Sequence, residues 1–168
     1  MNNMHKHKEQ RVAVLVDVAN MYHSAKNLYS RKVNFKEILK TATGSRKLIR
    51  AKAYVIRTES EEEFPFFEAL QQQGFEIKMK DLQIFTGGIK KADWDVGITV
   101  DAIRLAEKID VIVLITGDGD YVPLVNYIQS AKGCLVEVLA FKKTASSKLI
   151  EEADDFIDLS ENRKYLIK

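Results

Sequence analysis

The sequence predicts an α/β fold in which helices cover both faces of a central, mainly parallel sheet of five to six strands. The first observation is a pair of unbroken apolar runs, Val12–Val16 and Val111–Ile115, which are typical of strands buried on both faces of a sheet. The second is that predicted strands alternate with predicted helices, which favours parallel strands joined by helical connections. The length of 168 residues suits one three-layer domain with a substantial core.

Local patterns place the elements in order. Residues 1–10 are polar and are expected to form a flexible tail, residues 11–160 the folded domain, and residues 161–168 a C-terminal tail. Apolar runs and alternation predict strands at residues 11–17, 50–56, 75–79, 111–115, 135–141 and 156–159. Apolar positions at helical spacing predict helices at residues 20–29, 33–42, 59–73, 95–108, 121–132 and 144–153. Loops are expected at residues 43–47 and 81–92.

The expected order of strands places two acid-bearing strand ends together. The third strand alternates apolar residues with Glu76, Lys78 and Lys80, so we expect it at an edge. An order of third, second, first, fourth and fifth strand puts the first and fourth side by side in the centre. Sites in open α/β sheets lie beyond the carboxyl ends of such strands, where the connections diverge. The sequence therefore predicts an acidic cleft beyond the carboxyl ends of the first and fourth strands.

Composition excludes several classes of function. No apolar run approaches the roughly 20 residues of a membrane span, and the N-terminus lacks the apolar core of a signal peptide, so we expect a cytosolic protein without a membrane partner. One cysteine, Cys134, and three scattered histidines argue against a structural zinc site. The net charge of +2 means that any contact with nucleic acid must come from local clusters of lysine and arginine.

Several acidic residues near the strand ends have ordinary structural explanations when taken singly. Asp17 and Asn20 follow the first strand and are both good helix-capping residues. Asp118 and Asp120 lie in a glycine-rich sequence and are common turn residues. Asp95 precedes a predicted helix and could cap it.

Asp101 is harder to explain by local structure. It is the only charged residue from Val96 to Ile103, in the middle of a predicted helix, where a carboxylate needs a compensating partner. One interpretation is an ion pair with Arg104; the other is a shared site with Asp17, Asp118 and Asp120. Such a gathering of carboxylates is stable when a divalent cation supplies the opposite charge, and oxygen ligands suit Mg²⁺ or Mn²⁺.

Three segments closely resemble the NYN domain of the PIN-like nuclease superfamily, and within it the LabA/DUF88 group. They are Asp17-x-x-Asn20, then Lys91 ahead of Asp95-Val-Gly-Ile-Thr-Val-Asp101, then Thr116-Gly-Asp118-Gly-Asp120-Tyr-Val-Pro. In the common pattern one residue fewer separates the lysine from the first helix acid. The resemblance covers roughly residues 11–159 and implies a Rossmann-like PIN fold with metal-dependent RNA cleavage. It implies catalytic roles for Asp17, Asn20, Asp95, Asp101, Asp118 and Asp120, with Asp17, Asp101, Asp118 and Asp120 binding the metal.

The function that we expect is therefore a ribonuclease that uses Mg²⁺ or Mn²⁺ to hydrolyse RNA, with single-stranded RNA as its partner; a homodimer is left open. The residues expected to contact RNA are Lys90, Lys91, Lys142 and Lys143, through backbone phosphates, and Trp94, through a base. A haloacid dehalogenase-type phosphatase is disfavoured because its second acid would fall at Ala19. A non-catalytic RNA-binding or protein-interaction module with the same fold stays open as the alternative.

Overall fold

The central element of the protein is a parallel sheet. The computed structural model describes residues 6–88 and 90–168, except for the side chains of residues 90 and 91. The sheet order is β4-β3-β1-β7-β8-β9, and each neighbouring pair is parallel. Its strands are β1 (Arg11–Asp17), β3 (Lys47–Arg57), β4 (Glu76–Asp81), β7 (Val111–Ile115), β8 (Leu135–Ala140) and β9 (Asp155–Asp158). The expected fold class and strand order are confirmed, with the sixth strand added beside the fifth and the polar β4 at an edge.

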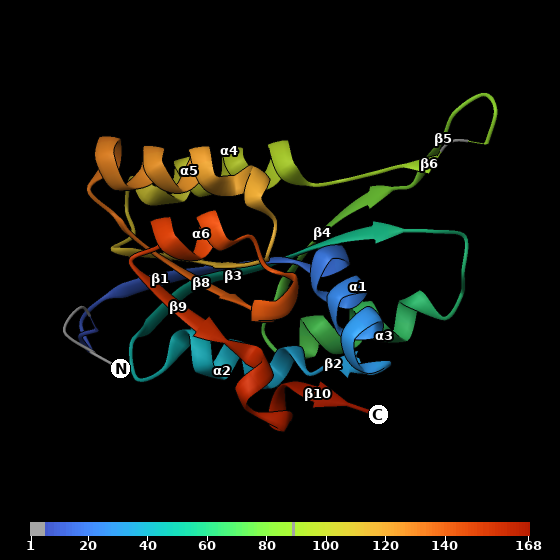
Figure 1. The fold of residues 1–168 in the computed structure, drawn as a ribbon, viewed down its shortest axis with the longest axis horizontal. Coiled ribbons are helices and arrows are strands. Elements are labelled where there is room, and N and C mark those ends of the chain that lie inside the picture. Colours follow the sequence, from blue (N-terminus) through green and yellow to red (C-terminus); the bar gives the residue numbers. More distant parts are fainter. Residues whose placement is uncertain (1–5, 89) are drawn as a thin grey trace.

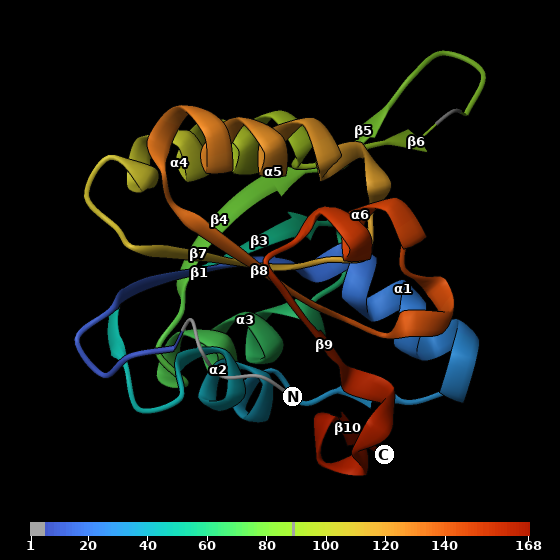
Figure 2. The same ribbon diagram turned by 60° about the vertical axis from the view of Figure 1, so that its left-hand side comes forward.

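Helices form a layer on each side of the sheet, as Figures 1 and 2 show. Side chains of α1, α2 and α3 pack with Val12, Val14 and Val16 in one core, and those of α4, α5 and α6 pack with Ala13 and Leu15 in the other. Because successive residues of a strand point to opposite faces, the apolar run of β1 serves both cores. The helices are α1 (Val18–Tyr29), α2 (Phe35–Thr43), α3 (Glu63–Gln72), α4 (Asp95–Ala106), α5 (Val122–Tyr127) and α6 (Ser147–Glu152).

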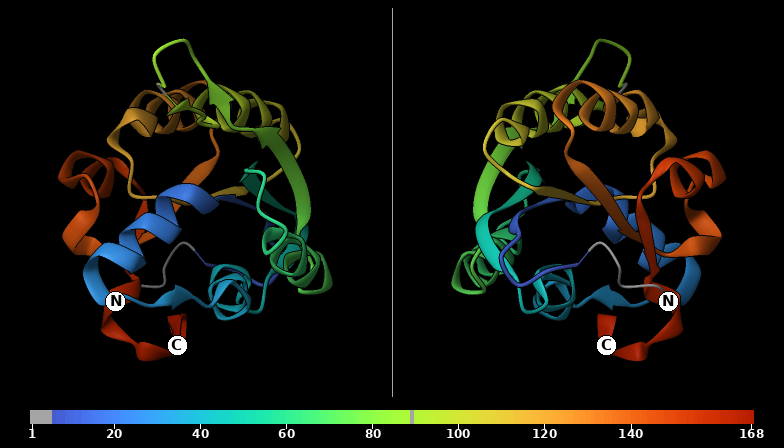
Figure 3. Two further views of the ribbon diagram at one scale, coloured as in Figure 1. Left: turned by 90° about the vertical axis from the view of Figure 1, so that its right-hand side faces the viewer. Right: turned by 90° about the vertical axis from the view of Figure 1, so that its left-hand side faces the viewer.

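Several expected elements have somewhat different bounds in the structure, and two regions also differ in kind. The predicted helix at 121–132 consists of a 3₁₀ turn, η1 (Gly119–Tyr121), then α5, then a π-helical segment, η2 (Ile128–Lys132). It ends at Gly133, whose φ of +63° favours glycine. The expected loop at 81–92 contains a short antiparallel pair, β5 (Gln83–Ile84) and β6 (Lys90–Lys91), which projects from the body of the molecule in all views (Figure 3).

The expected C-terminal tail is part of the fold. β10 (Leu166–Ile167) pairs in antiparallel fashion with β2 (Lys32–Val33). Tyr165 is 5% exposed, and its hydroxyl hydrogen-bonds Thr41 over 2.8 Å. The prediction of a tail at 161–168 is wrong because burial of this aromatic ring and the strand pairing anchor the segment.

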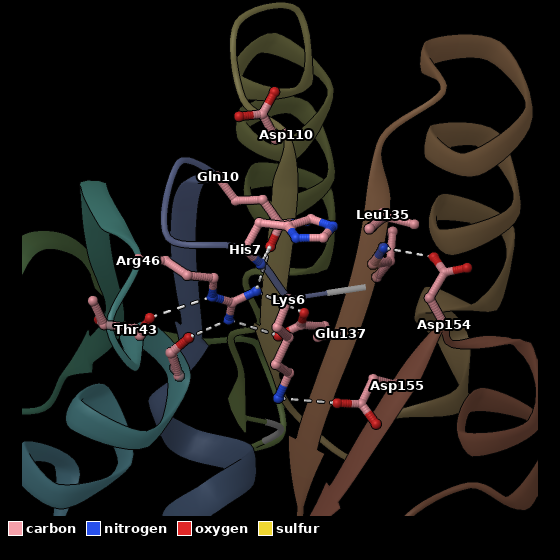
Figure 4. A network of polar contacts seen from close by, with 12 residues as sticks. Lys6, His7, Gln10, Thr43, Arg46, Asp110, Leu135, Glu137, Asp154 and Asp155 are labelled. Atoms are coloured by element: carbon pink, nitrogen blue, oxygen red, sulfur yellow. Dashed lines mark hydrogen bonds and ion pairs between the residues drawn. The ribbon is translucent and has the colours of Figure 1, made fainter. Parts of the chain in front are cut away.

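Residues at the start of the chain are also anchored where the structure describes them. The Lys6 ammonium lies 3.1 Å from the Asp155 carboxylate, and Lys47 donates its backbone N–H to the Gln10 carbonyl. Beneath this segment, at the amino end of the sheet, Arg46 and Glu137 form a buried ion pair with two hydrogen bonds of 2.8 and 2.9 Å (Figure 4). The remaining guanidinium N–H groups are also used, since Arg46 donates to the carbonyls of Ala42 and Thr43 and to the side chain of Gln10.

Within the described residues, no helix is both long and apolar enough to cross a membrane.

Candidate metal centre

Three carboxylates from three different segments meet at the carboxyl ends of the central strands of the sheet. Asp17 ends β1, Asp118 follows β7, and Asp95 begins α4. β1 and β7 are neighbours in the centre of the sheet, with Val16 opposite Ile115, so the residues that follow them must lie close together. One oxygen from each of the three carboxylates lies within 4.8 Å of the others.

Asp17 is the most buried of the three and is 9% exposed. It caps α1, since its Oδ1 accepts the backbone N–H of Asn20 over 3.3 Å. Its Oδ2 accepts from the hydroxyls of Thr116 and Tyr121, each over 3.4 Å. Burial raises the pKa of Asp17 to about 6, and the nearby charges of Asp95 and Asp118 act in the same direction against its backbone hydrogen bond.

Asn20 joins the first strand end to the loop after β7. Its side-chain Oδ1 accepts the backbone N–H of Gly117 over 2.9 Å. The capping interaction of this turn comes from the Asp17 side chain, so the amide of Asn20 serves the contact between two loops rather than the end of a helix.

The Gly117-Asp118-Gly119-Asp120 turn packs closely against the segment that precedes α6. A Cβ at Gly117 would lie 3.0 Å from the Cα of Ala145, and one at Gly119 would lie 2.8 Å from the Oγ of Ser146. A side chain at either position would therefore force its neighbour to shift. Asp118 caps the following turn by accepting the backbone N–H of Asp120 over 2.9 Å.

Asp95 lies in the first turn of α4, where a carboxylate interacts favourably with the helix dipole. Its Oδ1 accepts from the Tyr121 hydroxyl over 3.1 Å. Partial burial raises the pKa of Asp95, and the charges of Asp118, Asp93 and Asp120 add to this effect against the tyrosine hydrogen bond. Asp120 itself is exposed and lies outside the group of three.

The structure does not bring Asp101 to this group. Six residues along α4 correspond to about 9 Å of rise from Asp95. Asp101 accepts a hydrogen bond of 2.7 Å from the Tyr54 hydroxyl and lies 3.5 Å from the Lys52 ammonium. The expected metal-binding role of Asp101 is therefore unsupported, and its cation is Lys52 of β3 rather than Arg104. Asp95 takes the place in the carboxylate group that we assigned to Asp101.

The residues expected to contact RNA differ in their surroundings. Lys142 and Lys143 are exposed in the 3₁₀ turn η3 (Lys142–Thr144), which follows β8 at the same end of the sheet. Trp94 packs within the protein: its indole N–H donates to the Val55 carbonyl over 2.9 Å, and the Lys80 ammonium lies 4.3 Å from its ring centroid. The side chains of Lys90 and Lys91 lie outside the described residues.

Two hydroxyl groups at the site, those of Tyr121 and Thr116, were not identified from the sequence. Tyr121 begins a predicted helix and Thr116 directly follows a predicted strand, so neither position by itself indicates a site. The available signal was their position: each adjoins the Gly117–Asp120 turn.

The donor set fits a divalent cation. It consists of carboxylate oxygens alone, as Mg²⁺ and Mn²⁺ prefer. Among the described side chains, none of the three carboxylates takes part in an ion pair with lysine, arginine or histidine. The fold and this site together define a three-layer, PIN-like α/β protein with an acidic centre at the carboxyl ends of its central strands.

Comparison with known sequences agrees with this class. Residues 11–160 match the NYN domain, and the chain belongs to the NYN domain family. It is 27% identical over 127 residues to the low amplitude and bright protein LabA of Synechococcus elongatus, an alignment that covers 72% of this chain and 68% of that protein. The resemblance to LabA-type, PIN-like NYN domains is thereby confirmed.

Among solved structures, the fold is similar to that of a protein of unknown function from Vibrio parahaemolyticus. The TM-score is 0.88 and the sequence identity is 33%, and the match covers 98% of this chain and 100% of that one. The likeness therefore extends over the whole three-layer fold.

Proposed function

We propose that this protein is a metal-dependent ribonuclease that hydrolyses phosphodiester bonds of single-stranded RNA. The observation that carries the proposal is the approach of Asp17, Asp95 and Asp118 within 4.8 Å, without a protein cation among the described side chains. Membership of the NYN family supports RNA as the substrate class.

Asp17, Asp95 and Asp118 would hold one Mg²⁺ or Mn²⁺ ion between them. When bound, the ion would lower the pKa of water and neutralise charge on the scissile phosphate. Asp120 adds negative charge at the rim of the site, and Asn20 fixes the loop that carries Asp118 by accepting the Gly117 N–H. Asp17 ends a strand and Asp95 begins a helix, and the turn that carries Asp118 is held by its contact with Asn20, so the positions of all three are restrained.

Substrate would be held mainly through its backbone. Lys142 and Lys143 are exposed beside the carboxyl end of β8, where they can contact phosphates. We keep Lys90 and Lys91 as further phosphate-binding candidates on the projecting pair of strands. Trp94 is a weaker candidate for base stacking, because Lys80 covers its ring and Val55 accepts its N–H.

The test is cleavage of a labelled single-stranded RNA by purified protein with Mn²⁺ or Mg²⁺. We expect cleavage that stops with EDTA, that is lost in Asp118→Asn, and that leaves 5′-phosphate and 3′-hydroxyl ends. Products with 2′,3′-cyclic phosphate would indicate attack by the ribose hydroxyl and contradict the proposal. RNA binding without cleavage in any divalent metal would favour the non-catalytic RNA-binding module.

A further inference from the structure

The hydroxyl of Tyr121 contacts two of the three clustered carboxylates from the interior of the protein. Tyr121 is 1% exposed, and its ring belongs to the core that includes Leu124 and Val125. Its hydroxyl oxygen lies 3.1 Å from Asp95 Oδ1 and 3.4 Å from Asp17 Oδ2. It is also the last residue of η1, the turn that Asp118 caps. The Tyr121 side chain thus contacts two of the carboxylates, and Tyr121 lies three residues after Asp118, which carries the third.

We infer that Tyr121 is a positioning residue for the divalent cation, because its single hydroxyl proton is shared between Asp17 Oδ2 and Asp95 Oδ1. The inference rests on the metal site of the proposed function, but it does not depend on RNA cleavage. A carboxylate group is planar, so a hydrogen bond that fixes one oxygen restricts the orientation of the other. The hydroxyl therefore limits how far Asp17 and Asp95 can turn away from each other.

The need for such a restraint follows from electrostatics. Three carboxylates within 4.8 Å repel one another, and without a restraint their side chains would rotate apart. A cation would then have to bring them back together on binding, which weakens its affinity. Removal of a group that orients metal ligands typically costs about 10- to 100-fold in metal affinity.

The chain offers a matched control in Tyr54. This residue is 0% exposed, belongs to the same core as Tyr121, and also donates its hydroxyl to an aspartate of α4, Asp101, over 2.7 Å. Asp101 lies outside the carboxylate group and has Lys52 beside it. Tyr54→Phe and Tyr121→Phe therefore remove the same chemical group from similar surroundings, and only the second touches the proposed metal ligands.

The experiment measures the affinity of the metal-free, 168-residue protein for Mn²⁺ alone, from the loss of the free-ion signal in electron paramagnetic resonance. We expect Tyr121→Phe to weaken Mn²⁺ binding at least tenfold and Tyr54→Phe to change it less than twofold. Thermal unfolding in EDTA checks that both variants are folded. If Tyr121→Phe does not fold, Tyr121→Met provides a second variant that lacks the hydroxyl and keeps the apolar bulk.

Unchanged or tighter Mn²⁺ binding by the Tyr121 variant would overturn the inference, as would equal losses in both tyrosine variants. Absence of Mn²⁺ binding to the wild-type protein would overturn it together with the metal site. Weakened binding in Tyr121→Phe, by a protein that cleaves no RNA, would support the inference and contradict the proposed ribonuclease activity.

Discussion

Glu137, within β8, and Asp17, at the carboxyl end of β1, are both buried carboxylates of the same sheet, but they have opposite surroundings. Glu137 is 2% exposed and receives two hydrogen bonds from the buried guanidinium of Arg46. Asp17 is 9% exposed, and its charged neighbours are the carboxylates of Asp95 and Asp118. A buried charge with its counter-charge is tolerated in the folded state, whereas a gathering of like charges lowers stability and is typical of a functional site.

The largest effect is expected from breaking the ion pair at the amino end. Glu137→Gln would leave the Arg46 guanidinium buried without a counter-charge, and the loss of one partner of such a pair costs about 3–5 kcal/mol. Urea unfolding in EDTA measures this change. Glu76→Gln is the control, because it removes the partner of Arg50 from an exposed pair whose worth is about 0–1 kcal/mol. Equal costs for the two variants would contradict the distinction between buried and exposed pairs.

Addition of metal should act at the carboxyl end alone. Mn²⁺ at about one hundred times its dissociation constant should stabilise the native state by about 2.7 kcal/mol, which for a chain of this size corresponds to a rise in Tm of roughly 5–10 °C. Asp118→Asn should abolish the rise. Asp101→Asn should retain it, because Asp101 pairs with Tyr54 and Lys52 outside the site. Differential scanning calorimetry decides, and a lost response in Asp101→Asn would return that residue to the metal site.

The pH dependence of stability should reveal the cost of burying the charge of Asp17, to which the neighbouring carboxylates add. Because the pKa of Asp17 is raised in the folded protein to about 6 from a usual value near 4, the native state binds more protons than the unfolded state between these values. This group therefore makes stability fall as the pH rises from about 4 to 6, by roughly 2–3 kcal/mol. The measurement is the free energy of unfolding in EDTA at several pH values, for wild type against Asp17→Asn. A difference that is independent of pH would show that Asp17 titrates normally.

The smallest effect on stability is expected at Asn20. Asn20→Ala removes the hydrogen bond to the Gly117 N–H and should cost about 1 kcal/mol. It should also lower RNA cleavage per folded molecule, because the loop that carries Asp118 loses its contact with α1. Asn34→Ala is the control, since Asn34 caps α2 through the Glu37 N–H and should cost a similar amount without any effect on cleavage. Equal cleavage by both variants would assign Asn20 a purely structural role.

The sheet could be predicted because local sequence patterns determine which segments form its strands. The apolar runs of β1 and β7 can be read directly, and their carboxyl ends had to meet once those strands were neighbours. The environment of Asp101 could not be predicted, because its partners Tyr54 and Lys52 lie about 50 residues away in the sequence, on β3. The same holds for Glu137 and Arg46, which are 91 residues apart. Helical periodicity gives the face of a residue, but not which side chains of the sheet lie opposite.

The tight packing of Gly117 and Gly119 against Ala145 and Ser146 has a consequence for mutational tolerance. A scan of all substitutions scored by cellular function would mark both glycines as intolerant, as it would Asp118 between them, although glycine offers no side-chain ligand. Intolerance in this turn therefore reports two different requirements, space and charge. A compensating change of Ser146 to glycine would remove both atoms that a Cβ at Gly119 meets and so relieve the first requirement there, and no neighbouring change of size could relieve the second.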